Sequence, residues 1–285
     1  MTYSIIARDP DTGEMGVAVQ SKFPGAGSLV PFAEAGVGAV ATQAFGNYRH
    51  GIEGLRQLAS GHSPKEILKD LITQDSNQEE RQIAIMNNEG KSECFTGDAV
   101  HSWDGWAGCL QEEAFVAHGN SLYSKDVLQA AYQGFFSCTG DLGSKLIRGL
   151  ISAQDAGGEI RGQQSAALYL VQVGAGFEGY SGIKANISVY DHVEPIIELQ
   201  RCYGLHALSY YPSDPANLAN IEGSVATDVV TLLKRFGVLD QEVTHWNETY
   251  VPKLKRLMGT LNYDNRLRDD NKIDLEVLRD LKSKA

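Results

Sequence analysis

Thr2 is the residue of this sequence best suited to nucleophilic chemistry, provided that Met1 is removed. A small second residue permits removal of the initiator Met, and Thr2 then carries a free α-amine beside its own hydroxyl. Such an amine titrates at about pH 7.7 to 8.0 and can therefore accept the hydroxyl proton as a general base. The alternative is that Thr2 only begins a β-strand, a position that β-branched residues favour.

Ser21 and Lys22 end a strand-like segment that follows the one beginning at Thr2. The turn between the two segments contains Pro10 and Gly13, which predicts an antiparallel hairpin whose free ends meet. Ser21 can then relay a proton, and Lys22 can lower the pKa of the nucleophile or stabilise developing negative charge. A solvated lysine at a strand end is the alternative interpretation.

Thr42 and Gln43 follow the glycine-rich segment GVGAV at residues 36–40. Their side chains, together with backbone N–H groups of this segment, are candidate donors to an oxyanion or a substrate. The alternative is that the glycines only permit two sheets to pack closely.

A polar cluster at Arg161, Gln163 and Gln164 directly precedes the apolar segment that begins at Ser165. It is a candidate binding site for an amide or carboxylate substrate, with Arg161 as the carboxylate clamp. A hydrogen-bonded network with a purely structural role is the alternative.

Two histidine-containing segments, His118–Gly119–Asn120 and Asp191–His192, lie at expected strand ends. They are typical of turns and caps, and we retain only Asn120 as a candidate substrate-binding residue. Neither has the spacing of a metal site, and no Walker or GxGxxG motif follows a strand. We therefore expect neither a metal nor a nucleotide cofactor.

The composition is that of a globular protein: 285 residues, 42% hydrophobic, 21% charged, with a net charge of −11. The acidic balance argues against nucleic-acid binding. The sequence shows neither a membrane-spanning segment nor a signal peptide, so we expect a cytoplasmic protein without membrane association. We also expect a homodimer. The four cysteines lack CxxC spacing, and we expect free thiols rather than a disulfide or a zinc site.

The order of predicted elements indicates an α+β fold with two packed sheets and helices outside them. Alternating and apolar segments predict strands, and periods near 3.6 predict helices. Expected strands are residues 3–9, 15–22, 28–33, 36–45, 81–87, 89–97, 112–119, 165–173 and 185–191; helices are expected at 48–61 and 63–75, within 124–156, and from Pro195.

We expect a domain at residues 1–210, a linker at 211–220 and a small helical domain at 221–285. The linker prediction rests on the Pro, Asn and Ser content of YYPSDPANLAN. Two amphipathic segments, VATDVVTLLKRFG and KIDLEVLRDLKSKA, predict the helical domain.

Several motifs occur in an order that resembles the bacterial family called domain of unknown function 1028, over about residues 2–210. They are TYSIIARDPDTGEMGVAVQSK, AGVGAVATQ, HGN, RGQQSAAL and the DH before VEPIIEL. That family is similar to the N-terminal nucleophile hydrolases, which implies a four-layer αββα sandwich, amide hydrolysis and Thr2 as the nucleophile. The chain departs from the proteasome-like members because SLVPFA lacks their lysine, and Lys22 is only a neighbouring substitute.

The C-terminal region resembles a peptidoglycan-binding domain, on the segments VVTLLKRFG and YDNRLRDDNKIDLEVLRDL. This implies a small amide or peptide substrate related to muropeptides. Two other hypotheses remain open. One is a catalytically silent scaffold for ligand binding or assembly. The other is an enzyme that uses Ser4 or Ser21 as nucleophile, with His118 or His192 as base.

Overall fold

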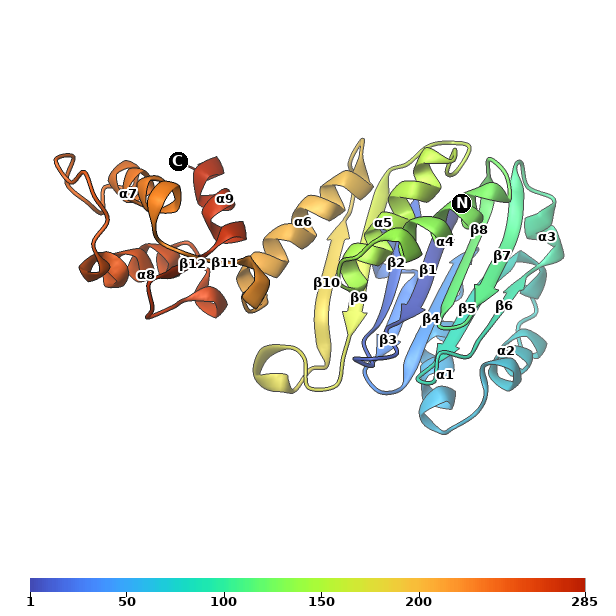
Figure 1. Ribbon diagram of the computed structural model, residues 1–285. Helices are drawn as coiled ribbons and strands as arrows, with labels where there is room; N and C mark the ends of the chain where they lie inside the picture. Colours follow the sequence, from blue (N-terminus) through green and yellow to red (C-terminus); the bar gives the residue numbers. More distant parts are fainter. Residues whose placement is uncertain (285) are drawn as a thin grey trace. The chain divides into compact units, whose positions relative to one another are not determined.

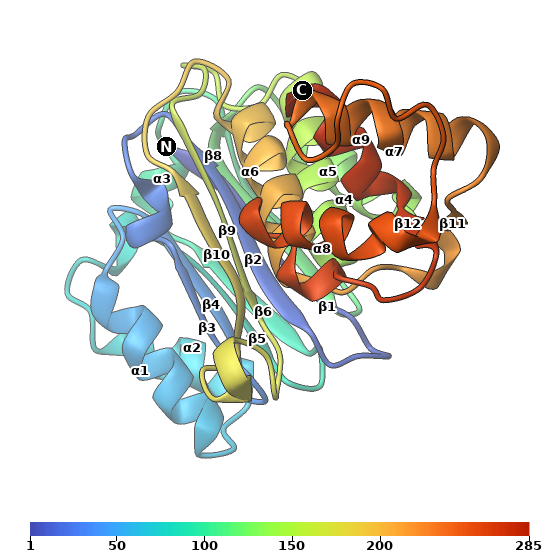
Figure 2. The same ribbon diagram turned by 90° about the vertical axis from the view of Figure 1, so that its left-hand side faces the viewer.

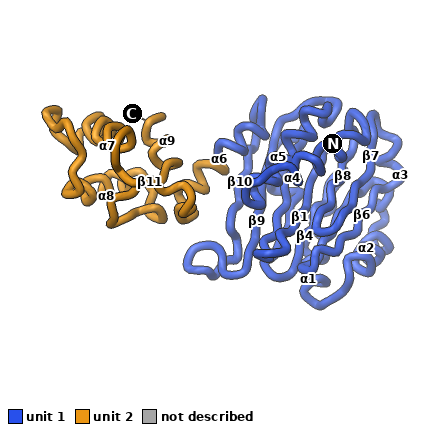
Figure 3. Tube along the Cα trace, viewed as in Figure 1, with its two compact units in different colours: residues 1–202 blue, residues 203–285 orange. Residues whose placement is uncertain are grey.

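The computed structural model describes residues 1–284. The chain forms two compact units, Met1–Cys202 and Tyr203–Ala285 (Figure 3). The division falls within helix α6 (Pro195–Tyr210) rather than at the expected residue 210. No helix in the described part of the chain is both long and apolar enough to cross a bilayer.

The first unit contains a six-stranded antiparallel sheet in the order β10-β9-β2-β1-β8-β7. The strands β1 and β2 are the predicted hairpin at the centre of this sheet, and Thr2 pairs with Ser21. The strands are β1 (Thr2–Arg8), β2 (Met15–Ser21), β7 (Trp106–Glu112), β8 (Phe115–Leu122), β9 (Ser165–Val171) and β10 (Ile183–Val189).

A second antiparallel sheet has four strands in the order β3-β4-β5-β6. Its strands are β3 (Pro31–Glu34), β4 (Gly38–Ala44), β5 (Arg81–Asn87) and β6 (Ser92–Thr96). Strands β4 and β5 contact β1, β2 and β8 of the first sheet, so the two sheets face one another.

Helices pack against the outward faces of both sheets (Figures 1 and 2). Helices α1 (Tyr48–Ala59) and α2 (Pro64–Thr73) pack on the four-stranded sheet, and α4 (Asp126–Ser137) and α5 (Leu142–Asp155) pack on the six-stranded sheet. Three of these helices begin after a capping side chain: Asn47 caps α1, Ser63 forms a capping box on α2, and Asp141 caps α5. The short helix α3 (Asp98–His101) precedes β7.

The alternation of side chains along β1 directs Thr2 toward the second sheet. Tyr3 faces the helices, where its hydroxyl donates to the Leu150 carbonyl of α5 at 3.3 Å. The alternate residues face the other sheet: Ser4 donates to Gln43 of β4, and Ile6 belongs to the apolar core between the sheets. Thr2 therefore lies where this intersheet layer ends.

The second unit has its own apolar core, formed mainly by α7 (Gly223–Arg235), α8 (Val251–Thr260) and α9 (Leu275–Lys284). It also contains a two-stranded sheet of β11 (Leu218–Asn220) and β12 (Lys272–Asp274). Strand β11 falls within residues 211–220, so the linker prediction was wrong. The Pro, Asn and Ser content of this segment indicated a loop, and the strand escaped prediction because its partner lies more than fifty residues further along the chain.

A disulfide joins Cys94 of β6 to Cys109 of β7, with a Cα–Cα distance of 6.8 Å. The expectation of four free thiols was therefore wrong for this pair, whereas Cys138 and Cys202 are free. This pairing could not be predicted from the sequence, because the two cysteines belong to different sheets and meet only where β6 contacts β7.

Replacing Cys94 and Cys109 together by Ser is expected to lower the free energy of unfolding by about 3 kcal/mol. The disulfide spans 15 residues, and closing a loop of that length restricts the unfolded chain by about this amount. Urea denaturation under non-reducing conditions measures the loss, with Cys138→Ser as the matched control. Equal stability of the double variant and the control would contradict the expectation.

Candidate functional site

A cavity of about 730 Å³ lies at the N-terminal end of β1, where the chain begins in Figures 1 and 2. It is bordered by the ends of β2 and β4, by the segments that follow them and by the first residue of β5. Its polar lining side chains are Thr2, Ser21, Thr42, Gln43, Arg81 and Arg161. Five of these six residues are among the predicted site residues; Arg81 is new.

Thr2 is held through its backbone nitrogen and through its hydroxyl. The nitrogen donates to Asn120 Oδ1 at 3.0 Å, and Oγ1 lies 2.9 Å from Ser21 Oγ. Ser21 donates its single hydroxyl hydrogen to the Met1 carbonyl oxygen at 2.9 Å. The Thr2 hydroxyl is therefore the donor to Ser21, and this order of donors points the oxygen lone pairs of Thr2 away from Ser21.

A buried network of side-chain amides lies behind Thr2, between the two sheets. Gln43 Nε2 donates to the Thr2 carbonyl at 3.2 Å and to Gln82 Oε1 at 2.8 Å. Asn120 Nδ2 donates to the same Gln82 oxygen at 2.7 Å, and Gln82 Nε2 donates to the Gly119 carbonyl at 2.8 Å. These amides are buried, so their hydrogen bonds are well protected from water and fix the backbone of Thr2. Sequence reasoning missed Gln82; its only signal was a polar residue on a buried strand.

Four predicted site residues lie outside the cavity lining: Lys22, Asn120, Gln163 and Gln164. Lys22 is exposed and donates from Nζ to the Gln163 carbonyl at 3.3 Å. Because successive side chains of a strand alternate, the residue after Ser21 turns away from Thr2. Gln164 donates to Asp191 Oδ1 at 2.9 Å.

Thr42 and Gly46 each carry a polar group that has no partner within the described chain. Thr42 is only 1% exposed and lines the cavity, yet its Oγ1 has no hydrogen-bond partner among residues 1–284. Gly46 also lines the cavity, and its N–H has no acceptor within the described chain, whereas the Phe45 N–H donates to the Glu80 carbonyl. Gly46 is exposed, so its N–H is open to a ligand. Thr42 lies on the same face of β4 as Val40, which packs with α1 and α2, whereas Gln43 faces Thr2, so the Thr42 hydroxyl points away from Thr2.

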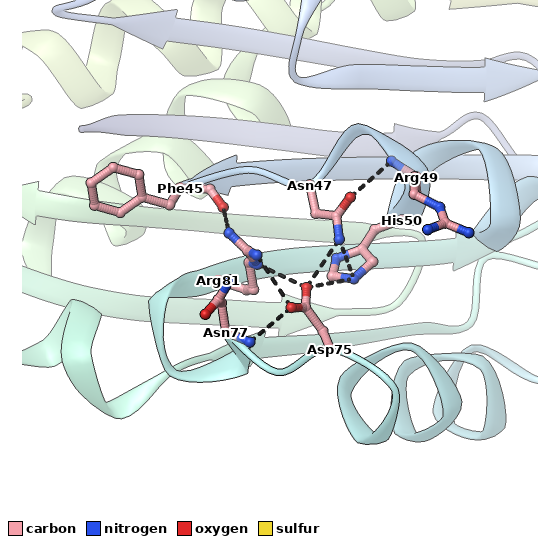
Figure 4. A network of polar contacts seen from close by, with 7 residues as sticks. All are labelled: Phe45, Asn47, Arg49, His50, Asp75, Asn77 and Arg81. Atoms are coloured by element: carbon pink, nitrogen blue, oxygen red, sulfur yellow. Dashed lines mark hydrogen bonds and ion pairs between the residues drawn. The ribbon is translucent and has the colours of Figure 1, made fainter.

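Asp75 and Arg81 hold the cavity wall that follows β4 (Figure 4). Arg81 donates from Nε to Asp75 Oδ2 at 2.8 Å and from Nη1 to the Phe45 carbonyl. Asp75 also accepts from Asn47, which caps α1, and lies 3.0 Å from His50 Nε2. The hydrogen bond from Arg81 holds the pKa of Asp75 well below its usual range, so the ion pair persists at neutral pH. The sequence carried no signal for this network beyond two charged residues six positions apart.

Arg161 lines the other side of the cavity and pairs with a buried carboxylate. Its Nε and Nη2 donate to the two oxygens of Glu159 at 2.9 and 3.2 Å. The Arg161 side chain is 44% exposed and that of Glu159 is 0% exposed. Burial, followed by the positive charge of Arg161, lowers the pKa of the Met1 α-amine to about 6. The positive charge of Arg161 therefore acts electrostatically on the N-terminal amine.

His118 does not act on the candidate serines. It is fully buried, both ring nitrogens lack hydrogen-bond partners among the described residues, and Ser4 donates to Gln43 instead. His192 lies outside the cavity lining, and its Nδ1 accepts from the Glu194 N–H. The geometry gives no support to a serine nucleophile with a histidine base.

Acid is expected to destabilise the protein through His118. Burial lowers the pKa of His118 to about 3 from its usual 6.5. Between pH 6.5 and 3 the unfolded chain therefore binds a proton at this histidine that the folded chain does not bind. The free energy of unfolding falls over this range by up to about 5 kcal/mol. Urea denaturation across this range should give a flatter pH dependence for His118→Leu than for the wild type; identical slopes would contradict the expectation.

Comparison with known proteins identifies the family of this chain. The model of the family of unknown function DUF1028 matches residues 2–199. The chain belongs to this family. The family resemblance predicted from the sequence is thus confirmed, with an end eleven residues earlier than residue 210.

A crystal structure of a DUF1028 protein from Silicibacter pomeroyi is similar to this chain, with 27% identity and a TM-score of 0.66. The similarity covers 72% of this chain and 86% of that one. Anbu, an ancestral beta-subunit from Yersinia bercovieri, shows 12% identity and a TM-score of 0.35 over 71% of this chain and 93% of its own. The chain matches no curated protein.

Proposed function

We propose that the first unit is an N-terminal nucleophile amidohydrolase that uses Thr2 after removal of Met1. The observation that carries the proposal is the position of Thr2, whose nitrogen and hydroxyl are both hydrogen-bonded at the edge of a cavity. The two facing sheets with helices on their outer faces support the αββα sandwich that this class of enzyme uses.

The α-amine of Thr2 is the general base in this proposal. Once Met1 is removed, the amine still donates one hydrogen to Asn120 Oδ1, and its lone pair accepts the Thr2 hydroxyl proton directly or through Ser21. Thr2 Oγ1 then attacks the amide carbon, and the carbonyl oxygen becomes an oxyanion. The Gly46 N–H, which borders the same cavity, is the candidate donor to that oxyanion.

Collapse of this intermediate breaks the C–N bond and leaves an ester on Thr2. The ammonium formed on the N-terminus gives its proton to the departing amine, so the base is regenerated. A water molecule then loses a proton to the α-amine and attacks the ester carbon. The bond from that carbon to Thr2 Oγ1 breaks, the ammonium returns its proton to Oγ1, and the carboxylic acid leaves. Lys22 has no role in these steps, because it is exposed and lies outside the cavity lining.

A catalytically silent scaffold remains the competing function, and the state of the N-terminus distinguishes the two. Intact-mass measurement of the purified protein should show loss of one Met residue, after which a library of small amides should contain at least one substrate. A retained Met1 would overturn the proposal because Thr2 would then lack a free amine. The peptidoglycan-related role of residues 221–285 rests on sequence resemblance alone and stays a prediction.

A further inference from the structure

We propose that the cavity beside Thr2 selects a small amide that carries both a bulky apolar group and a carboxylate, such as an N-acyl amino acid. This inference rests on the proposed amidohydrolase function and names its substrate class. The two parts of the ligand correspond to an apolar wall and to Arg161.

The apolar wall consists of large side chains that the fold leaves exposed. Phe23, Leu29, Phe45 and Tyr48 all line the cavity, and each is about half exposed. Trp103, another lining residue, makes an edge contact with Phe45 at a centroid distance of 5.8 Å. Soluble proteins seldom leave several large apolar side chains exposed around one cavity, and such a group typically marks a binding site.

These side chains come from separate segments of the chain that meet at one place. Phe23 and Leu29 follow β2, Phe45 and Tyr48 follow β4, and Trp103 follows α3. The segment that carries Phe45 is held from behind by Arg81, Asp75 and Asn47. The wall is therefore pre-organised near Phe45, which reduces the entropic cost of binding an apolar group there.

The charged side chains in the cavity lining are both cationic: Arg81 and Arg161. Their carboxylate partners, Asp75 and Glu159, are buried and outside the lining, with side-chain exposures of 6% and 0%. Arg81 donates to Asp75 and to the Phe45 carbonyl, so it serves to position the wall. Arg161 binds Glu159 through Nε and Nη2, and its Nη1 has no acceptor within residues 1–284. Arg161 is thus the residue available to a ligand carboxylate.

The volume of about 730 Å³ lies within the usual range for a site that takes one small molecule, about 300 to 1,000 Å³. Thr2, the apolar wall and Arg161 all border this one cavity. A ligand of the size of an acylated amino acid can therefore place its amide at Thr2 while it contacts both other parts.

Binding to the full-length Thr2→Ala variant tests the inference without any need for turnover. The four ligands are phenylacetylglycine, phenylacetylglycinamide, acetylglycine and acetylglycinamide, measured by calorimetry. We expect phenylacetylglycine to bind at least about tenfold more tightly than either compound that lacks one group, since each group adds a separate contact. Equal affinities, or no binding of phenylacetylglycine at millimolar concentration, would overturn the inference.

A double variant, Glu159→Gln with Arg161→Gln, tests the assignment of the carboxylate to Arg161. Removing both charges avoids leaving Glu159 buried and unpaired. We expect this double variant to bind phenylacetylglycine about tenfold more weakly than the parent protein and to bind phenylacetylglycinamide with unchanged affinity. The matched control, Glu89→Gln with Lys91→Gln, removes an exposed ion pair outside the cavity lining and should change neither affinity. Equal losses for the acid and the amide would contradict the assignment.

Failure of the inference is distinguishable from failure of the proposed function. If the wild type binds the four ligands with the expected preference but hydrolyses none of them, the substrate class stands as a ligand class and the amidohydrolase proposal fails. If it hydrolyses all four at similar rates, the amidohydrolase proposal stands and the inference fails.

Discussion

Replacing Thr2 by Ala should lower amide hydrolysis by at least about 10⁴-fold, because the variant has no nucleophile. The free energy of unfolding should change by only about 1 kcal/mol, since the side chain contributes one hydrogen bond, to Ser21. Thr2→Ser retains a hydroxyl beside the α-amine and should keep measurable activity. Initial rates on a substrate of the wild type, together with urea denaturation, check both expectations.

Thr73→Ala is the matched control for this substitution. Its hydroxyl donates to the Lys69 carbonyl within helix α2, and it lies outside the cavity lining. The control should hydrolyse the substrate at the wild-type rate. Equal turnover by Thr2→Ala and Thr73→Ala would exclude Thr2 as the nucleophile.

Replacing Asn120 by Ala should lower kcat about 100-fold. The substitution removes the acceptor that holds the Thr2 nitrogen at 3.0 Å, and loss of orientation at a reacting group commonly costs this much. It also removes a donor to Gln82, so the free energy of unfolding should fall by about 1 to 3 kcal/mol. Steady-state kinetics and urea denaturation measure the two effects.

Ser4→Ala separates positioning from general loss of stability. It removes a hydrogen bond to Gln43 in the same buried network and leaves the Thr2–Asn120 bond in place. We expect a similar loss of stability and a much smaller loss of kcat. Asn120→Asp places an acidic group beside the α-amine, so it should move the acidic limb of the pH profile to higher pH. An unchanged pH profile and equal kcat values for Asn120→Ala and Ser4→Ala would assign Asn120 a structural role.

The hairpin register was the part of the site that the sequence predicted well. The turn between residues 9 and 14 made the ends of β1 and β2 meet, and this placed Ser21 beside Thr2. The same reasoning overlooked the alternation of side chains, which turns Lys22 toward Gln163. The local sequence pattern therefore predicted which strand ends meet. Which side chain reaches the site depends on the alternation of side chains along the pleated strand.

Contacts between distant segments escaped prediction for a common physical reason. Gln82 meets Asn120, and Cys94 meets Cys109, only because one sheet packs on the other. The apolar wall likewise gathers residues that follow different strands and a helix. Propensity and periodicity describe single elements, and such pairs depend on how the elements pack.

The central claim is that the α-amine of Thr2 acts as the general base. Inserting one Ala between Met1 and Thr2 tests this claim most directly. After Met removal the inserted Ala carries the free amine, whereas Thr2 keeps its hydroxyl and its backbone N–H to Asn120. Intact mass verifies the N-terminus of both proteins, and the measured quantity is kcat/KM on an amide that the wild type hydrolyses. We predict that kcat/KM falls by at least about 10³-fold, because the nucleophile then has no base on its own residue. Wild-type kcat/KM in the Ala-extended chain would contradict it.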